Sequence, residues 1–170
     1  MAWNTPRTWA ANEVLTAANM NTYISEDLSY LGTNRPHCQV RDATGPTGTA
    51  SWVNPSWDAI TTNVGSMASS STGFVRLPTA GFYLIGGSVL FGADGTAGVR
   101  GLMLSTSSSG GGTALAQSNT TIHSGNASGA TAMTGYQVSG ITDIYLSWFV
   151  PSGFTGGVTN IRMWAIWMTT

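Results

Sequence analysis

From residue 37 to the end of the chain, short apolar segments alternate with clusters of glycine, proline, serine and threonine. This pattern is typical of short β-strands separated by turns. Roughly eight to ten strands at this spacing predict an antiparallel β-sandwich or jelly roll over residues 37–170. The expected strands are residues 37–42, 50–53, 57–62, 74–77, 82–91, 99–105, 114–122, 131–138, 143–150 and 160–168, and residues 93–96 are expected to form a hairpin turn.

Several of these strands carry large apolar side chains on both faces, most clearly residues 82–91, 143–150 and 160–168. Burying one large side chain contributes about 1.5–3 kcal/mol, whereas an antiparallel strand often leaves one face in water. The pattern therefore predicts a homo-oligomer in which another copy of the chain covers the second face. The residues assigned to this interface are Tyr83, Phe91, Trp148, Trp164 and Trp167.

The corner before residue 82 carries a resemblance to a known family. Pro78 ends a short strand because it lacks an N–H, and Gly81 can take the positive φ of a tight turn. The run Leu77-Pro78-Thr79-Ala80-Gly81-Phe82-Tyr83, followed by alternating apolar residues, resembles the core strand of complement-type, tumour-necrosis-factor-like jelly rolls. Because those domains form tight trimers with this strand near the threefold axis, the resemblance implies a homotrimer.

Residues 1–36 predict an extended N-terminal arm and one short α-helix. Thr16 is placed to cap a helix over residues 17–31, and Gly32 to end it. Met20, Ile24, Leu28 and Leu31 form one apolar stripe at helical spacing. A helix of this length is marginal alone in water and needs a partner for its stripe. Trp3 and Trp9 favour docking of the arm onto a different protein, the alternative being that they pack on the chain's own helix.

The same segment carries a second resemblance. Its residues Trp3-x-Thr5-Pro6-x-Thr8-Trp9-Ala10, then Glu13-Val14-Leu15-Thr16-Ala17-Ala18-x-Met20-Asn21, are similar to the amino-terminal segment of many small tailed-bacteriophage virion proteins. Asn12 stands where that family usually has glycine, a departure that touches only the turn before the helix. The resemblance implies an attachment segment, with Trp3, Trp9 and the Met20–Leu31 stripe bound to another virion protein.

Composition narrows the remaining classes of function. Only 8% of residues are charged and the net charge is −1, which argues against nucleic acid or an anionic membrane surface as a partner. No apolar run has the length of a membrane span, and Cys38, the sole cysteine, cannot form an internal disulfide. These features, with no signal-peptide pattern at the start, predict assembly in a reducing cytoplasm.

Candidate chemistry is sparse. The seven acidic residues are scattered, and neither His37 nor His123 has metal-ligand spacing around it. A calcium ion at Asp94 is less favoured than a plain turn. We therefore expect no catalytic, cofactor-binding or metal site and no enzyme.

The leading expectation is a trimeric virion protein that decorates the capsid or forms a head fibre and contacts the major capsid protein or tail proteins. The alternatives are a tail-fibre or receptor-binding protein that recognises a host surface glycan and, less favoured, a glycan-degrading enzyme. An exposed loop with stacked tryptophan or tyrosine would favour the receptor-binding alternative.

Overall fold

The alternating pattern builds nine strands in the part of the chain that the computed structural model describes. The described residues are 10, 11, 13, 14, 16–25, 28, 35–45, 50–70, 72–108 and 112–169. The strands are β1 (His37–Gly45), β2 (Ala59–Val64), β3 (Phe74–Leu77), β4 (Gly81–Phe91), β5 (Gly98–Ser105), β6 (Ala114–Ile122), β7 (Ser128–Val138), β8 (Thr142–Phe149) and β9 (Val158–Thr169). All belong to the second of two compact units, Met1–Arg35 and Pro36–Thr170.

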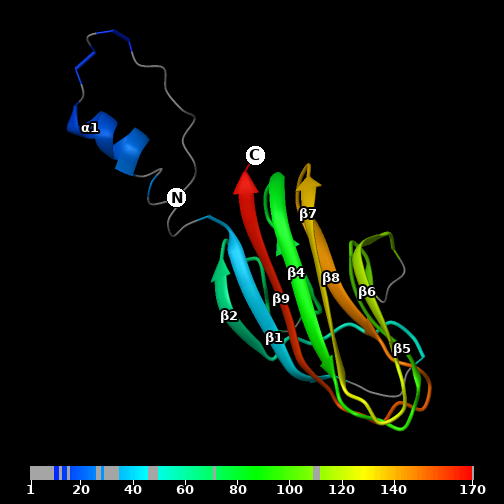
Figure 1. Cartoon of the computed structure of the whole chain (residues 1–170). Helices are drawn as coiled ribbons and strands as arrows, with labels where there is room; N and C mark the ends of the chain where they lie inside the picture. Colours follow the sequence, from blue (N-terminus) through cyan, green and yellow to red (C-terminus); the bar gives the residue numbers. More distant parts are fainter. Residues whose placement is uncertain are drawn as a thin grey trace. The chain divides into compact units, whose positions relative to one another are not determined.

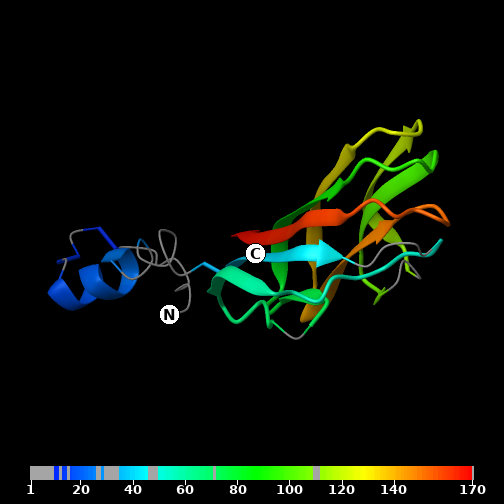
Figure 2. The same ribbon diagram turned by 90° about the horizontal axis from the view of Figure 1, so that it is seen from below.

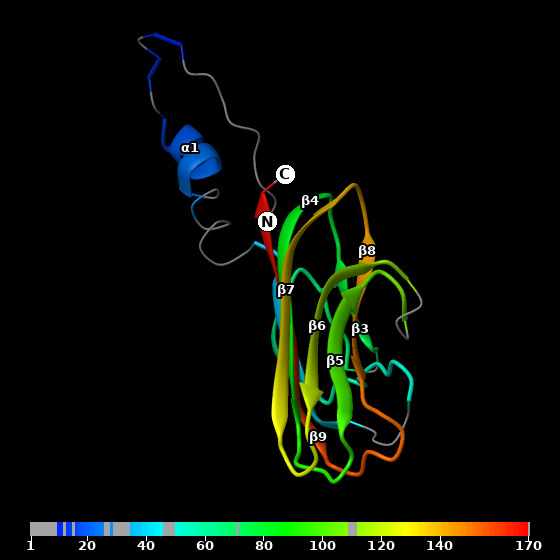
Figure 3. The same ribbon diagram turned by 45° about the vertical axis from the view of Figure 1, so that its right-hand side comes forward.

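The strands form two antiparallel sheets that pack face to face. One sheet has five strands in the order β2-β1-β9-β4-β7, and the other has four in the order β3-β8-β5-β6. Figure 3 shows them as two layers, with β4 and β7 in one and β3, β5 and β6 in the other. In Figure 2, β9 (red) runs beside β1 (cyan). The predicted mainly β antiparallel sandwich is therefore confirmed.

The hydrophobic core lies between the two sheets, because each strand turns every second side chain inward. From β4 the inward residues include Tyr83 and Phe91, and from β8 they include Leu146 and Trp148, all at most 1% exposed. The polar atom of Tyr83 is satisfied locally, since its hydroxyl donates to the carbonyl of Thr79 at 3.1 Å. This bond fixes the corner between β3 and β4, where Gly81 takes the predicted positive φ of 140°.

Two local predictions were wrong. Residues 50–53 form no strand of their own, and only Val53 pairs there, through an isolated bridge to Trp148. Residues 93–96 join β4 and β5, which lie in different sheets, so they are a crossover and not a hairpin. Asp94 does make the local turn expected of it, because Thr96 N donates to Asp94 Oδ1 at 2.6 Å. Turn chemistry predicted the bend but not which strands pair on either side.

In the first unit, a short helical segment follows the predicted cap. The Thr16 side chain accepts a hydrogen bond from Asn19 N at 3.2 Å, and α1 (Ala17–Met20) begins directly after it. The segment continues as the π-helical turn η1 (Asn21–Ser25). The cap was predicted correctly, whereas residues 21–25 are π-helical within the predicted α-helix, and Leu28 is again α-helical. The predicted end of the helix at residues 31 and 32 lies outside the described residues.

Candidate oligomer interface

The side of the five-stranded sheet that faces away from the core carries an apolar centre, which we call the outer face. Its side chains come from alternate positions of β4, β7 and β9, and the strand register places them in rows. Leu84 lies opposite Ile166 of β9. In the next row, Gly86 lies between Trp164 on β9 and Met133 on β7. These three neighbouring strands thus present an apolar surface at the centre of the sheet.

Two glycines let aromatic rings lie close to the backbone of this surface. A Cβ at Gly86 would overlap the ring of Trp164, and a Cβ at Gly135 would overlap the ring of Phe82. The rings therefore cover the bare backbone of the neighbouring strands, which is one way a strand glycine is compensated. The result is a smooth surface, as close packing against a second chain requires.

The outer face leaves apolar area in contact with solvent. Met133 is 61% exposed, Leu90 is 48% exposed and Met168 is 45% exposed, and all three point outward. Single exposed apolar residues are ordinary on protein surfaces, but a contiguous patch marks an interaction site. The register makes the patch around Leu84, Met133, Trp164 and Ile166 contiguous, whereas Leu90 lies beyond a polar row of Ser88, Thr131 and Arg162.

Two arginines lie at the polar margin of the outer face. Arg41 on β1 is directly opposite Arg162 on β9, and both are exposed. Like charges opposite each other across two strands repel. Among the described residues, neither guanidinium has an ion-pair partner, whereas Arg76 pairs with Asp143. A partner surface that carries a carboxylate would relieve this repulsion.

The structure corrects four of the five residues assigned to the interface. Tyr83, Phe91 and Trp148 are at most 1% exposed and Trp167 is 6% exposed within a single chain, so they belong to its own core. The alternation showed which residues share a face, but it did not show that the four-stranded sheet already covers one of the two faces. Only Trp164 lies on the outer face, where it is half-buried.

The interface residues that were missed had a readable signal. Phe82 and Leu84 alternate with Tyr83 along one strand and so share the opposite face, and a glycine inside a strand, as at 86 and 135, is typical of a place where another group lies close to the backbone. The pairing of these glycines with rings on other strands could not be read, because it depends on the register of β4 against β7 and β9.

The predicted attachment residues fall in the first unit. Met20 is 47% exposed, Ile24 is 39% exposed and Leu28 is 64% exposed, so this part of the stripe is accessible among the described residues. Trp3, Trp9 and Leu31 lie outside the described residues.

At one end of the sandwich, Asp94 ties two loops together. Thr155 N, Thr155 Oγ1 and Gly156 N all donate to Asp94 Oδ2, at 2.8, 2.6 and 2.9 Å. The hydrogen bonds from Thr155 and Thr96 hold the pKa of this carboxyl far below its ordinary value of 3.8. Because both oxygens already accept hydrogen bonds, Asp94 is a structural anchor between the β4–β5 and β8–β9 loops.

The guanidinium of Arg100 binds backbone carbonyls of the loops at this end of the sandwich. Its side chain is fully buried, and Nη1 donates to the carbonyls of Gly92 and Asn126 at 3.1 Å each. The guanidinium also lies 4.6 Å from the centre of the Phe154 ring, a favourable cation–π arrangement. The loop carbonyls are thus occupied by the chain's own cation.

Other chemical groups offer little reactivity. Burial raises the pKa of the Cys38 thiol to about 12, which keeps it protonated and unreactive near neutral pH. Within the described ranges, no three His, Cys, Asp or Glu side chains are grouped so as to hold a metal ion. None of the helices in those ranges is long and apolar enough to cross a membrane.

Comparisons with known proteins add no family. Neither the models of protein families nor the curated proteins gave a match to this chain.

Proposed function

We propose that this protein is a structural component of a bacteriophage virion, in which three copies associate through the outer face of the five-stranded sheet. The observation that carries the proposal is the contiguous apolar patch around Leu84, Met133, Trp164 and Ile166. Its rings lie close over glycines, and its margin carries two arginines that lack ion-pair partners among the described residues. An isolated chain would leave this surface in water.

The strand order supports the jelly-roll part of this proposal. With the edge strand β2 left out, the two sheets read β1-β9-β4-β7 and β3-β8-β5-β6. Both sheets therefore interleave strands from the first and second halves of the domain, as two Greek keys folded over each other do. The resemblance of residues 77–83 to trimeric jelly rolls favours three copies over two.

The first unit is proposed to attach the trimer to the particle. The exposed side chains of Met20, Ile24 and Leu28 supply an apolar stripe among the described residues, and Trp3 and Trp9 precede it in the sequence. A capsid-decoration or head-fibre role predicts many copies on the head. Quantitative staining of particles purified by density gradient measures the number directly, and a handful of copies confined to the tail would contradict the proposal.

A matched pair of variants tests the attachment stripe on the same particles. Leu28→Asp adds a charge to the stripe, whereas Ser25→Asp adds the same charge at another exposed position. We expect Leu28→Asp to lower the copy number several-fold and to leave the melting temperature of the sandwich unchanged. Equal incorporation of both variants into particles would show that the stripe does not bind the particle.

A second candidate function is recognition of a host surface glycan by a tail-fibre or receptor-binding protein. One observation favours it. Trp52 lies in an irregular segment and not in a strand, is half-buried, and packs beside Phe149 with ring centres 5.8 Å apart. This is the kind of aromatic residue on a loop that the receptor-binding alternative called for.

A further inference from the structure

The far side of the four-stranded sheet, which faces away from the core, holds Trp52 in a fixed position. Residues 50–58 form an irregular segment that runs along β8 beyond the end of β3. Val53 exchanges two backbone hydrogen bonds with Trp148, each 2.9 Å long. The side-chain amide of Asn54 donates to Leu146 O and Ser147 Oγ, both at 2.9 Å. Because Val53 turns inward with Trp148, Trp52 must turn outward.

Trp52 meets a pair of amide side chains on this surface. The ring lies over Gly101 of β5, where a Cβ would come within 3.1 Å of it. Gly101 also leaves room for Asn119, its partner on β6, whose Oδ1 accepts a hydrogen bond from Gln117 Nε2 at 3.1 Å. Both amides are exposed, so each keeps further donor or acceptor capacity.

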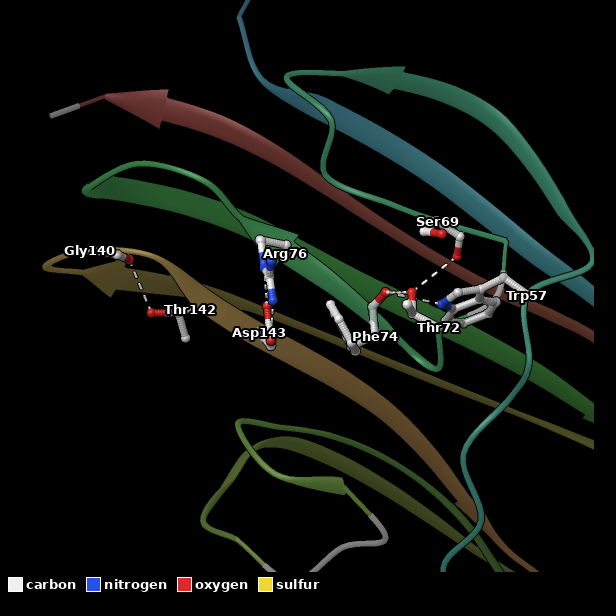
Figure 4. A network of polar contacts seen from close by, with 8 residues as sticks. All are labelled: Trp57, Ser69, Thr72, Phe74, Arg76, Gly140, Thr142 and Asp143. Carbon is white, nitrogen blue, oxygen red and sulfur yellow. Dashed lines mark hydrogen bonds and ion pairs between the residues drawn. The ribbon is translucent and has the colours of Figure 1, made fainter.

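A second aromatic pair lies farther along β8. Phe74 and Tyr145 have ring centres 5.6 Å apart, and Figure 4 shows Phe74 beside the ion pair of Arg76 with Asp143. That pair is bidentate, with N–O distances of 2.7 and 2.9 Å. Tyr145 and Phe149 are four residues apart, so the two pairs lie about 13 Å apart at 3.3 Å per residue. A cavity of about 150 Å³, lined by Ser69, Thr72 and Phe74 among others, adjoins the second pair.

The aromatic side chains on this side of the sheet do more than cover the apolar residue beneath them. Met103, between the two pairs, is 4% exposed and is covered. Yet Trp52, Phe74, Tyr145 and Phe149 all remain partly exposed, although the guanidinium of Arg76 lies 5.3 Å from the centre of the Phe74 ring. Burying Met103 does not require four partly exposed aromatic residues on one face of one sheet.

The chemistry of the surface selects its ligand. The positive charge of Arg76 on this surface is neutralised by Asp143, so the surface has no net charge that would attract an anion. It combines flat aromatic rings with amides and an ion pair, whereas the outer face of the other sheet exposes leucine and methionine. Ligand sites of this mixed kind bind molecules with both apolar faces and hydroxyl groups. A sugar has both, since its C–H face packs on an aromatic ring and its hydroxyls bond to amides.

We propose that the surface formed by Trp52, Phe149, Gln117 and Asn119, extended by Phe74 and Tyr145, binds a neutral oligosaccharide. The spacing of the aromatic pairs fits several linked sugars better than one. This proposal rests on the second candidate function and gives it a place in the fold. It is independent of trimer formation, because it uses the opposite side of the sandwich.

The test is affinity electrophoresis of the full-length protein in native gels that contain dextran, mannan or a neutral bacterial O-polysaccharide. We expect at least one polysaccharide to slow the wild-type protein. Trp52→Ala should weaken this binding at least tenfold and Asn119→Ala several-fold. Ile141→Ala removes a 72% exposed apolar side chain from the β7–β8 turn and should bind as the wild type does.

Every result bears on the proposal. Retardation by none of the three polysaccharides overturns it, as does unchanged binding of both site variants. If Trp52→Ala does not fold, Asn119→Ala decides alone, since its side chain is exposed. Sedimentation of the same samples separates the two proposals, because a trimer that binds no polysaccharide fails only the glycan surface.

Discussion

At the scale of single residues, Asp94 and Arg100 show how a chain with few charges uses them. Each is buried at one end of the sandwich, and each forms its hydrogen bonds with neutral groups, although Nε of Arg100 has no hydrogen-bond partner. Asp94 accepts from backbone N–H groups and a threonine hydroxyl, whereas Arg100 donates to carbonyls. Charged groups in such hydrogen bonds hold loops more firmly than neutral ones would. The two residues thus hold three loops together.

Asp94 predicts how stability depends on pH. Its pKa is lower in the folded chain than its ordinary value of 3.8, so the unfolded chain binds the proton more readily. The carboxylate therefore stabilises the fold above about pH 4, and this contribution is lost as the pH falls further toward the folded-state pKa. Thermal melts from pH 7 to pH 3 should show the wild type losing stability below pH 4.

The Asp94→Asn variant checks the assignment. Its amide nitrogen cannot accept from Thr155 and Gly156, so we expect a melting temperature several degrees lower at pH 7 and a flatter response below pH 4. Asp143→Asn is the matched control, because it breaks a surface ion pair of the kind that contributes about 0–1 kcal/mol. A variant Asp94→Asn as stable as this control would show that the anchor is unimportant.

At the scale of elements, the sequence predicted strands well where turn residues bracket an alternating run. β3 and β6 begin and end at the predicted residues, and the other strands in the described ranges differ by a few residues at their ends. The strand predicted at residues 50–53 was wrong because the pairing of this segment depends on the free edge of β8, which lies about ninety residues away in the sequence. The assignment of four aromatic residues to the oligomer interface was wrong for a related reason. Periodicity shows which side chains share a face of a strand, but the packing of the two sheets decides which face is covered.

The glycine beneath Trp164 gives a prediction at this scale. Gly86→Ala adds a methyl group where the ring lies, so Trp164 must tilt away from the sheet and roughen the outer face. Overpacking of this kind costs about 1–3 kcal/mol, and we expect both a lower melting temperature and weaker self-association. Gly140→Ala is the control, since a Cβ there meets nothing within 4 Å. Sedimentation and thermal melts of the two variants should differ clearly, and equal behaviour would show that the Trp164 ring does not depend on the space above Gly86.

At the scale of the whole molecule, the two sides of the sandwich differ in chemistry. One exposes aliphatic side chains around Leu84, and the other exposes aromatic rings among amides and an ion pair. Leu84→Glu places a carboxylate at the centre of the proposed trimer contact. An uncompensated buried charge costs about 3–5 kcal/mol, which corresponds to at least a hundredfold weaker association. Sedimentation velocity at micromolar concentration should show the wild type as a trimer and this variant as a folded monomer.

Thr121→Glu is the control for this experiment, because it adds the same charge at an exposed position on β6 of the other sheet. It should remain trimeric. A wild-type protein that sediments as a monomer would refute the trimer itself, whereas a trimeric Leu84→Glu would move the contact to another surface.

The two ends of β1 and β9 matter for anyone who wishes to display a cargo on this protein. β1 begins beside the last residues of β9 (Figure 1). His37 lies opposite Ile166, and Trp167 N donates to Pro36 O at 2.8 Å. A fluorescent protein fused to the carboxyl terminus would therefore emerge where the amino-terminal segment enters the sandwich and would crowd it. A short epitope grafted into the β6–β7 loop near Ser124 would leave from the opposite end, clear of that junction.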